Sequence, residues 1–225
     1  MIIFAADSKT WISIDINTDT MKVLMINGSP REHGNTARAL AEVARTLNEE
    51  GVETLIINIG KKAVQGCIAC GWCGREGRCT FRDDLYSEVM RAVKDGIDGL
   101  IVGSPVYYGQ PNGAVMAVLQ RAFFSGANVQ NKPAAAVAIC RRGGATAAYQ
   151  TINMIFEMMN MPVVTSQYWN IAYGLAPGEV TQDTEGMQTM RTLADNMAWL
   201  LKKIHANGNP DYPEREEWQG MNFIR

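Results

Sequence analysis

The sequence predicts an α/β fold in which one parallel β-sheet is covered by helices on both faces. Apolar strand-like segments alternate with amphipathic helical segments from residue 22 onward. Most of these strand-like segments are almost continuously apolar, as is typical of strands buried on both faces. The chain has 225 residues, of which 47% are hydrophobic, so one domain with a sizeable core is expected.

The elements are expected to alternate along the chain as strand and helix. The strands are predicted at 22–27, 52–58, 99–104, 133–140 and 162–169, the last at an edge because it is more polar. The first helix begins at 35–36 and ends before Gly51, and the second spans about 83–94 with Asp83 or Asp84 as its cap. The remaining helices run through 115–122, through 152–159 and over about 184–206.

Three segments lie outside this alternating pattern, so the core domain is predicted to span 21–206. Residues 1–20 contain the alternating stretch WISIDI, which is either an added β-ribbon or an extension ahead of an internal start at Met21. Residues 66–80 are a cysteine-rich insertion. The C-terminal tail, 207–225, contains Trp218, Phe223 and Ile224. We expect these apolar side chains to dock on the tail's own subunit or on a neighbour.

Composition excludes several classes of partner. The net charge is −2, which argues against a nucleic-acid or anionic-membrane surface. The longest apolar run, 133–140, is too short to cross a bilayer, and the N-terminus lacks the cationic start of a secretory signal. The clustered cysteines indicate reduced thiols. The sequence therefore predicts a cytoplasmic protein with no nucleic-acid or membrane partner.

Three loops of unusual composition are expected at the carboxyl ends of the strands, where open parallel sheets bind ligands. In the first, 27–37, Gly28 permits a turn, Ser29 and Thr36 offer hydroxyls, and Arg31 adds charge. The free N–H groups at the start of the following helix favour an anion. Asn35 stands where a Walker loop has lysine, so the loop suits a single terminal phosphate. Taken alone, the loop is also compatible with an ordinary turn.

The second loop, 103–113, combines rigidity with aromatic side chains. Pro105 stiffens it, Gly109 loosens one point, and Tyr107 and Tyr108 supply flat faces with polar ends. Such a loop can line a planar heteroaromatic ring.

The third loop, 140–146, is rich in glycine. Gly143 and Gly144 allow the backbone to approach a ligand closely, and Arg141 or Arg142 can meet the electron-rich pyrimidine side of a flavin. A phosphate loop, an aromatic loop and a glycine-rich loop at one sheet edge together describe a site for FMN.

Two of these loops resemble a known family. GSPR…GNT after the first strand and GSPVYYG after the third resemble the flavodoxin-like NADPH-dependent FMN reductases, and the run Cys-x2-Cys-x2-Cys-x5-Cys is similar to the iron–sulfur flavoproteins of that superfamily. The resemblance covers about 21–204. It implies a flavodoxin-like three-layer sandwich with sheet order 2-1-3-4-5, and a homodimer or homotetramer with a flavin near a subunit interface. It also implies phosphate contacts from Ser29, Arg31, Asn35 and Thr36, and flavin contacts from Pro105, Val106, Tyr107, Tyr108, Gly109, Gly143 and Gly144.

Four cysteines, Cys67, Cys70, Cys73 and Cys79, fall within fifteen residues. A [4Fe–4S] cluster is the first interpretation, because four closely spaced thiolates can surround one cluster. Nearby Arg75, Arg78 and Arg82 would offset its negative charge. Free thiols, or a cluster lost in air, rank second, and a structural zinc ion ranks third because zinc usually takes two separated cysteine pairs. The fifth cysteine, Cys140, is interpreted as a buried apolar residue.

These motifs predict a redox protein. FMN would accept electrons from NAD(P)H or from a reduced ferredoxin-type partner and pass them to a small-molecule or protein acceptor. The flavin carries the chemistry, so no side chain is assigned as a catalytic acid or base. The alternatives are an electron carrier without nicotinamide activity and a zinc-stapled module without enzymatic activity.

Overall fold

The computed structural model describes residues 20–208, 210, 212–217 and 219–220. The β-ribbon considered for 1–20 therefore lies outside the described residues except for Thr20, and so do Trp218, Phe223 and Ile224 of the tail. Within the described tail, the Arg215 guanidinium donates to the side-chain oxygens of Gln130, at 2.9 Å, and Asn131, at 2.7 Å. No helix among the described residues is both long enough and apolar enough to cross a membrane.

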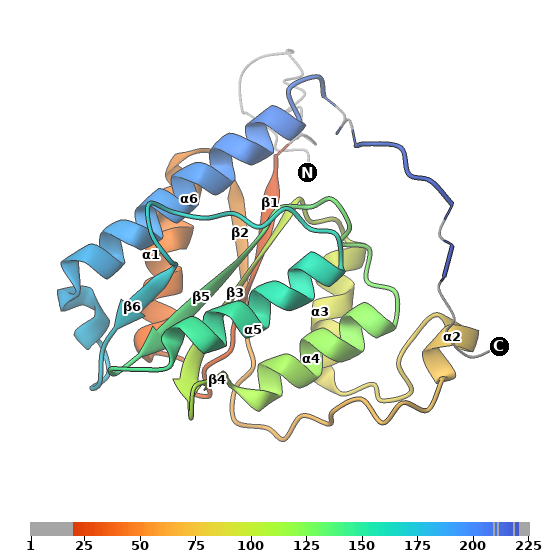
Figure 1. Ribbon diagram of the computed structural model, residues 1–225, viewed down its shortest axis with the longest axis horizontal. Coiled ribbons are helices and arrows are strands. Elements are labelled where there is room, and N and C mark those ends of the chain that lie inside the picture. Colours follow the sequence, from red (N-terminus) through yellow and green to blue (C-terminus); the bar gives the residue numbers. More distant parts are fainter. Residues whose placement is uncertain (1–19, 209, 211, 218, 221–225) are drawn as a thin grey trace, which may run out of the picture.

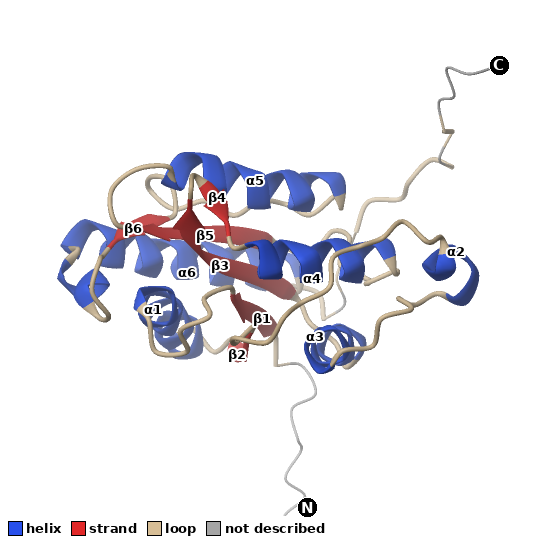
Figure 2. Cartoon of the chain, turned by 90° about the horizontal axis from the view of Figure 1, so that it is seen from below, coloured by secondary structure: helices blue, strands red, loops and turns tan. Residues whose placement is uncertain are grey.

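A twisted sheet lies between two layers of helices (Figures 1 and 2). Its strands run in the order β2-β1-β3-β5-β6, all parallel, with β4 paired antiparallel to β3. Counting only the parallel strands, this is the predicted order 2-1-3-4-5, which is confirmed. The strands are β1 Lys22–Asn27, β2 Glu53–Asn58, β3 Gly99–Tyr107, β4 Gln110–Pro111, β5 Ala134–Cys140 and β6 Ile171–Tyr173.

The helices fall where amphipathic segments were predicted, with two short additions. The long helices are α1 Asn35–Glu49, α3 Asp84–Lys94, α4 Gly113–Phe124, α5 Ala145–Met158 and α6 Thr184–Ile204. The additions are α2 Trp72–Glu76, inside the cysteine segment, and the 3-10 turn η1 Glu179–Gln182. In both views α2 lies at one end of the molecule, beyond α3 and α4 (Figures 1 and 2).

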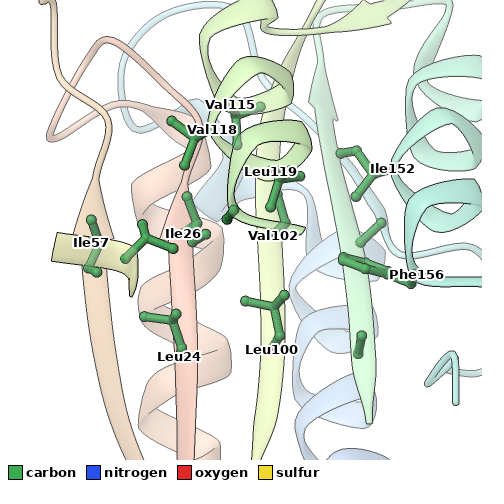
Figure 3. Close-up of a cluster of buried hydrophobic side chains, with 14 of the residues drawn as sticks. Leu24, Ile26, Ile57, Leu100, Val102, Val115, Val118, Leu119, Ile152 and Phe156 are labelled. Atoms are coloured by element: carbon green, nitrogen blue, oxygen red, sulfur yellow. The ribbon is translucent and has the colours of Figure 1, made fainter. Parts of the chain in front are cut away.

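Successive residues of each central strand point to opposite faces of the sheet, and both faces are buried. In β1, Leu24 and Ile26 pack with α3, α4 and α5, whereas Val23 and Met25 pack with α1 and α6. Figure 3 shows the first of these two clusters, in which Phe156 of α5 faces the sheet. Burial on both faces explains why the strands read as continuous apolar runs.

The predicted strand at 162–169 is wrong. Only Val163 pairs there, in an isolated bridge with Ala134, and the edge strand is β6, Ile171–Tyr173. The Asn170 side-chain amide donates to Ala136 O at 3.1 Å and to Val164 O at 3.3 Å. The chain therefore touches β5 at Val163, loops away through polar residues, and returns to β5 after Asn170 has bridged the gap.

Candidate functional site

The loop after β1 is fastened to the neighbouring strand β3. The Gly28 N–H donates to Gly103 O at 2.7 Å. A Cβ atom on Gly28 would lie 2.7 Å from that same oxygen, so a side chain is excluded without movement of the backbone. The first loop therefore leaves the sheet in direct contact with β3.

This loop ends at the first N–H groups of α1, which have no partner within the helix. The N-cap residue is Gly34, and within the described chain no side chain caps this helix. The first N–H to bond back along it is that of Arg38, to Gly34 O at 3.1 Å. Ser29 and Thr36 are buried beside these donors, and the Ser29 hydroxyl accepts the Arg31 N–H at 3.1 Å. This arrangement of donors favours an anion such as a phosphate.

The Asn35 side chain is engaged elsewhere. Its amide nitrogen donates to Ala176 O at 3.0 Å, and its oxygen accepts the N–H groups of Gly178 at 2.8 Å and Val180 at 3.3 Å. Asn35 thus holds the loop after β6 against the start of α1. Any contact of Asn35 with a phosphate in this arrangement would come from its backbone N–H.

The second loop is a β-hairpin rather than the open loop predicted after residue 104. Strand β3 continues to Tyr107, which pairs with Gln110 of β4. Tyr108 and Gly109 form the two-residue turn with φ of 52° and 76°, as primed hairpin turns require. The hairpin leaves Tyr108 fully exposed and Tyr107 partly exposed at the rim.

Asn112 joins the first two loops. Its side-chain nitrogen donates to Gly28 O at 2.9 Å, and its side-chain oxygen accepts the Ala114 N–H at 3.0 Å, capping α4. Its own N–H donates to the buried Ser104 hydroxyl at 2.9 Å. Sequence reasoning did not single out Asn112, although an Asn directly ahead of an apolar helix is a recognisable capping signal.

The third loop contacts the second. Gly144 has φ of 84°, and a Cβ atom there would lie 2.8 Å from the Gly109 Cα. Nothing lies within 4 Å of the corresponding position on Gly143. Gly144 is thus needed for the third loop to pack against the second, whereas the described residues leave the space beside the Gly143 Cα empty. The predicted meeting of the three loops at one sheet edge is observed. Arg141 lies on the third loop, whereas Pro105 and Val106 lie at the end of strand β3.

The four clustered cysteines line one cavity of about 200 Å³. Its wall is mostly apolar, with Phe81 and Phe124 among its residues. Among the described residues, no three Cys, His, Asp or Glu side chains converge closely enough to hold a single metal ion. The four cysteines therefore surround a shared space and do not converge on one point. They are Cys67, Cys70, Cys73 and Cys79.

A buried arginine from α4 also borders this cavity. Arg121 Nε donates to Cys79 Sγ at 3.4 Å, and the guanidinium pairs with the Asp83 carboxylate at 2.5 Å. Burial opposes the charge of Arg121, but these two partners raise its pKa above the ordinary value. Sequence reasoning missed Arg121 because it considered only arginines close to the cysteines in the chain. An arginine inside the apolar helix AVMAVLQRAFF was the available signal.

Residues 21–176 match the family of NADPH-dependent FMN reductases. This chain belongs to that family. It is 36% identical to an iron-sulfur flavoprotein from Methanocaldococcus jannaschii, over 82% of this chain and 99% of that protein. It is 32% identical to the iron-sulfur flavoprotein of Methanosarcina thermophila, over 83% of this chain and 98% of that protein.

The fold agrees with this assignment. The structure of a flavodoxin from the domain Archaea superimposes with a TM-score of 0.55 at 15% identity, over 81% of this chain and 99% of that one. The predicted flavodoxin-like sandwich is therefore confirmed as the fold of this family member.

Proposed function

We propose that this chain is an FMN-dependent oxidoreductase that passes electrons from NAD(P)H or a reduced redox partner to an acceptor. The observation that supports it best is the connection of three loops at the carboxyl edge of β1, β3 and β5. Asn112 ties the first loop to the second, and Gly144 packs the third against the second. The bound FMN would supply the redox chemistry, accepting electrons and releasing them to the acceptor.

The residues of the first loop would hold the phosphate of FMN. Backbone N–H groups of Asn35 and Thr36 stand at the uncapped start of α1, and the Ser29 hydroxyl is buried beside them. Because the Ser29 oxygen already accepts the Arg31 N–H, the hydroxyl proton is available to donate to a phosphate oxygen. The exposed Arg31 side chain would add positive charge from the solvent side.

The second and third loops would hold the flavin ring. Tyr107 and Tyr108 stand at the tip of a rigid hairpin, where their rings can limit access of water to one side of the ring system. Gly143 leaves space for close backbone approach, and Arg141 follows β5 directly. Hydride transfer to a flavin needs no side-chain acid or base, which agrees with the site as described.

The cysteine cavity would hold a [4Fe–4S] cluster. Each iron of such a cluster takes one thiolate, so its four ligands must surround a shared space, as these do. The buried guanidinium of Arg121 donates to Cys79 Sγ, and such a donor suits a sulfur that carries negative charge. When bound, the cluster would supply one-electron transfer.

The same cavity favours a second candidate function, a one-electron carrier with no nicotinamide activity. The relatives named iron-sulfur flavoproteins and the four thiols around one space both support a protein that exchanges single electrons with a ferredoxin-type partner. The third possibility, a zinc-stapled module, would be colourless and free of flavin.

One experiment separates these functions. The protein is purified without oxygen, and FMN, iron and sulfide are assayed on the same sample. NADPH, NADH and reduced ferredoxin are then added separately while flavin absorbance is followed. Bleaching by a nicotinamide supports the oxidoreductase, bleaching by ferredoxin alone supports the carrier, and a colourless zinc protein contradicts both.

The cysteine assignment has its own test. We expect Cys70→Ser and Cys73→Ser to remove the iron while FMN stays bound, because the thiols lie apart from the three loops. Cys140→Ala is the matched control, since Cys140 is buried in β5 away from the cavity. Iron that survives in both serine variants would contradict the assignment.

We also propose that the protein works in the cytoplasm as a homodimer or homotetramer. The clustered thiols suit a reducing compartment. Light scattering of the FMN-loaded protein gives the subunit number, and a monomer at micromolar concentration would contradict the assembly.

A further inference from the structure

Arg121 is the one charged residue in the buried interior of the described chain. Only 1% of its surface is exposed, although it sits on α4 among apolar residues. A buried charge costs several kcal/mol unless it is paired and hydrogen-bonded. The partners of the Arg121 guanidinium therefore indicate its structural role.

Those partners bracket the cysteine segment on both sides. Nη1 donates to Gln65 O at 3.2 Å, just before Gly66, and Nη2 donates to Phe81 O at 2.6 Å, just after Thr80. One planar guanidinium thus fastens both ends of the segment 66–80 to α4. Nothing else in the described chain bonds both of these carbonyls, so the spacing between the two ends depends on this side chain.

The same group also places a positive charge at a cysteine sulfur. Nε donates to Cys79 Sγ at 3.4 Å, and the Asp83 carboxylate lies against Nη1 on the other side. The Tyr86 ring stacks over the guanidinium at 4.8 Å from the ring centroid. Protein, not water, therefore surrounds this charge, and its field is less screened than that of a surface arginine.

We propose that Arg121 is the positioning and tuning residue of the cysteine cavity: it closes the segment around the cluster and its fixed charge raises the cluster's reduction potential. The inference rests on the proposed [4Fe–4S] cluster. Net charge and hydrogen bonds at the sulfurs are two of the properties that set such potentials. A positive charge beside a ligand stabilises the more negative, reduced cluster.

The arginines within the segment are less suited to this role. Arg75 and Arg78 lie over the Trp72 ring at 5.7 and 5.8 Å from its centroid, and Arg78 is also 3.9 Å from the Glu76 carboxylate. The Arg78 side chain is 40% exposed, so solvent weakens its field.

The test uses variants that separate charge from geometry. Arg121→Gln removes the charge, and Arg121→Lys keeps it but loses the planar fork that reaches both carbonyls. Asp83→Asn removes the opposing charge while retaining a residue that caps α3 well. Arg91→Gln, at an exposed position on α3, is the control for loss of one positive charge.

Each protein is loaded with FMN and reconstituted anaerobically with iron and sulfide, and the cluster potential is measured by a redox titration followed by electron paramagnetic resonance. We expect a more negative potential in Arg121→Gln, a more positive one in Asp83→Asn, and no shift in Arg91→Gln. Arg121→Lys should keep a potential near that of the parent protein but hold less iron per FMN. A merely structural arginine would lose iron in Arg121→Gln and Arg121→Lys alike, without a more negative potential confined to the glutamine variant.

Arg121 variants with full iron and an unshifted potential would overturn the inference. Where Arg121→Gln fails to retain a cluster, Arg121→Lys decides: less iron per FMN with a potential near that of the parent protein supports the inference, and full iron or a clearly more negative potential overturns it. If the parent protein takes up no cluster, both this inference and the proposed [4Fe–4S] cluster are wrong. FMN binding by the same sample then shows separately whether the proposed flavin site is correct.

Discussion

Replacing Asn112 with alanine tests how the loops of the flavin site are joined. The change removes the cap of α4 and the bond from Asn112 to Gly28 O. An N-cap is worth about 1 kcal/mol, and one loop-to-loop hydrogen bond contributes about 1 kcal/mol more. We therefore expect a loss of about 2 kcal/mol in unfolding free energy, which lowers Tm by about 4–8 °C in a protein of this size.

FMN affinity should fall as well, because one of the bonds that hold the first and second loops together would be lost. If the loosened loops must be ordered again when FMN binds, at a cost of about 1 kcal/mol, binding weakens about fivefold. Urea unfolding of the FMN-free protein gives the stability, and fluorescence titration with FMN gives the affinity.

Asn112→Ser is the matched control, because serine is a good cap but too short to reach Gly28 O. We expect this variant to lose about half as much stability as Asn112→Ala, and to lose as much FMN affinity. The reasoning is refuted if Asn112→Ser binds FMN as tightly as the parent protein, or if it is as unstable as Asn112→Ala.

The other predictions concern loop packing and acid stability. Gly144→Ala forces a Cβ to 2.8 Å from the Gly109 Cα at a positive φ, so it should cost about 1–3 kcal/mol of stability and weaken FMN binding. Gly143→Ala should leave the stability nearly unchanged and weaken only FMN binding in the same titrations, because its Cβ would enter the space proposed for the flavin. The pKa of Glu42 lies below its ordinary value, because hydrogen bonds from Arg45 and then Arg191 outweigh the effect of burial. The resulting stability is present above the ordinary glutamate pKa and is lost as pH falls through the lowered one. Arg191→Gln should therefore cost about 0.5–1 kcal/mol at pH 7 and less at pH 3, as measured by urea unfolding; an equal loss at both would contradict the pairing.

Helix α4 connects the two parts of the proposed site. Asn112 caps its start beside the first loop, and Arg121 lies nine residues further on, about 14 Å along a helix axis. Figure 2 shows α4 running from the region of β4 toward the cysteine segment. A single rigid element thus positions both the hairpin rim and the cysteine cavity, so a change that shifts α4 should affect flavin and cluster together.

Most of the fold could be predicted because its signals are local. A strand buried on both faces must be apolar throughout, and residues such as Val23 and Leu24 show this without any knowledge of their partners. The start of α3 was also readable, because Asp83 caps it through a bond to the Tyr86 N–H only three residues away. The edge strand was misplaced because the chain contacts β5 twice, at Val163 and again at β6, and the Asn170 side chain spans the gap between these two contacts.

The sequence by itself determined the order of elements, the family and the types of residue available at the two sites, since each of these depends on composition or on spacing along the chain. Only the tertiary structure decided that the Asn35 side chain holds the loop after β6 and that Arg121 reaches Cys79 from another helix. These contacts join residues more than forty positions apart, including a pair separated by 141. No local pattern specifies such partners, because they are chosen by where the packed sheet and helices bring the chain together.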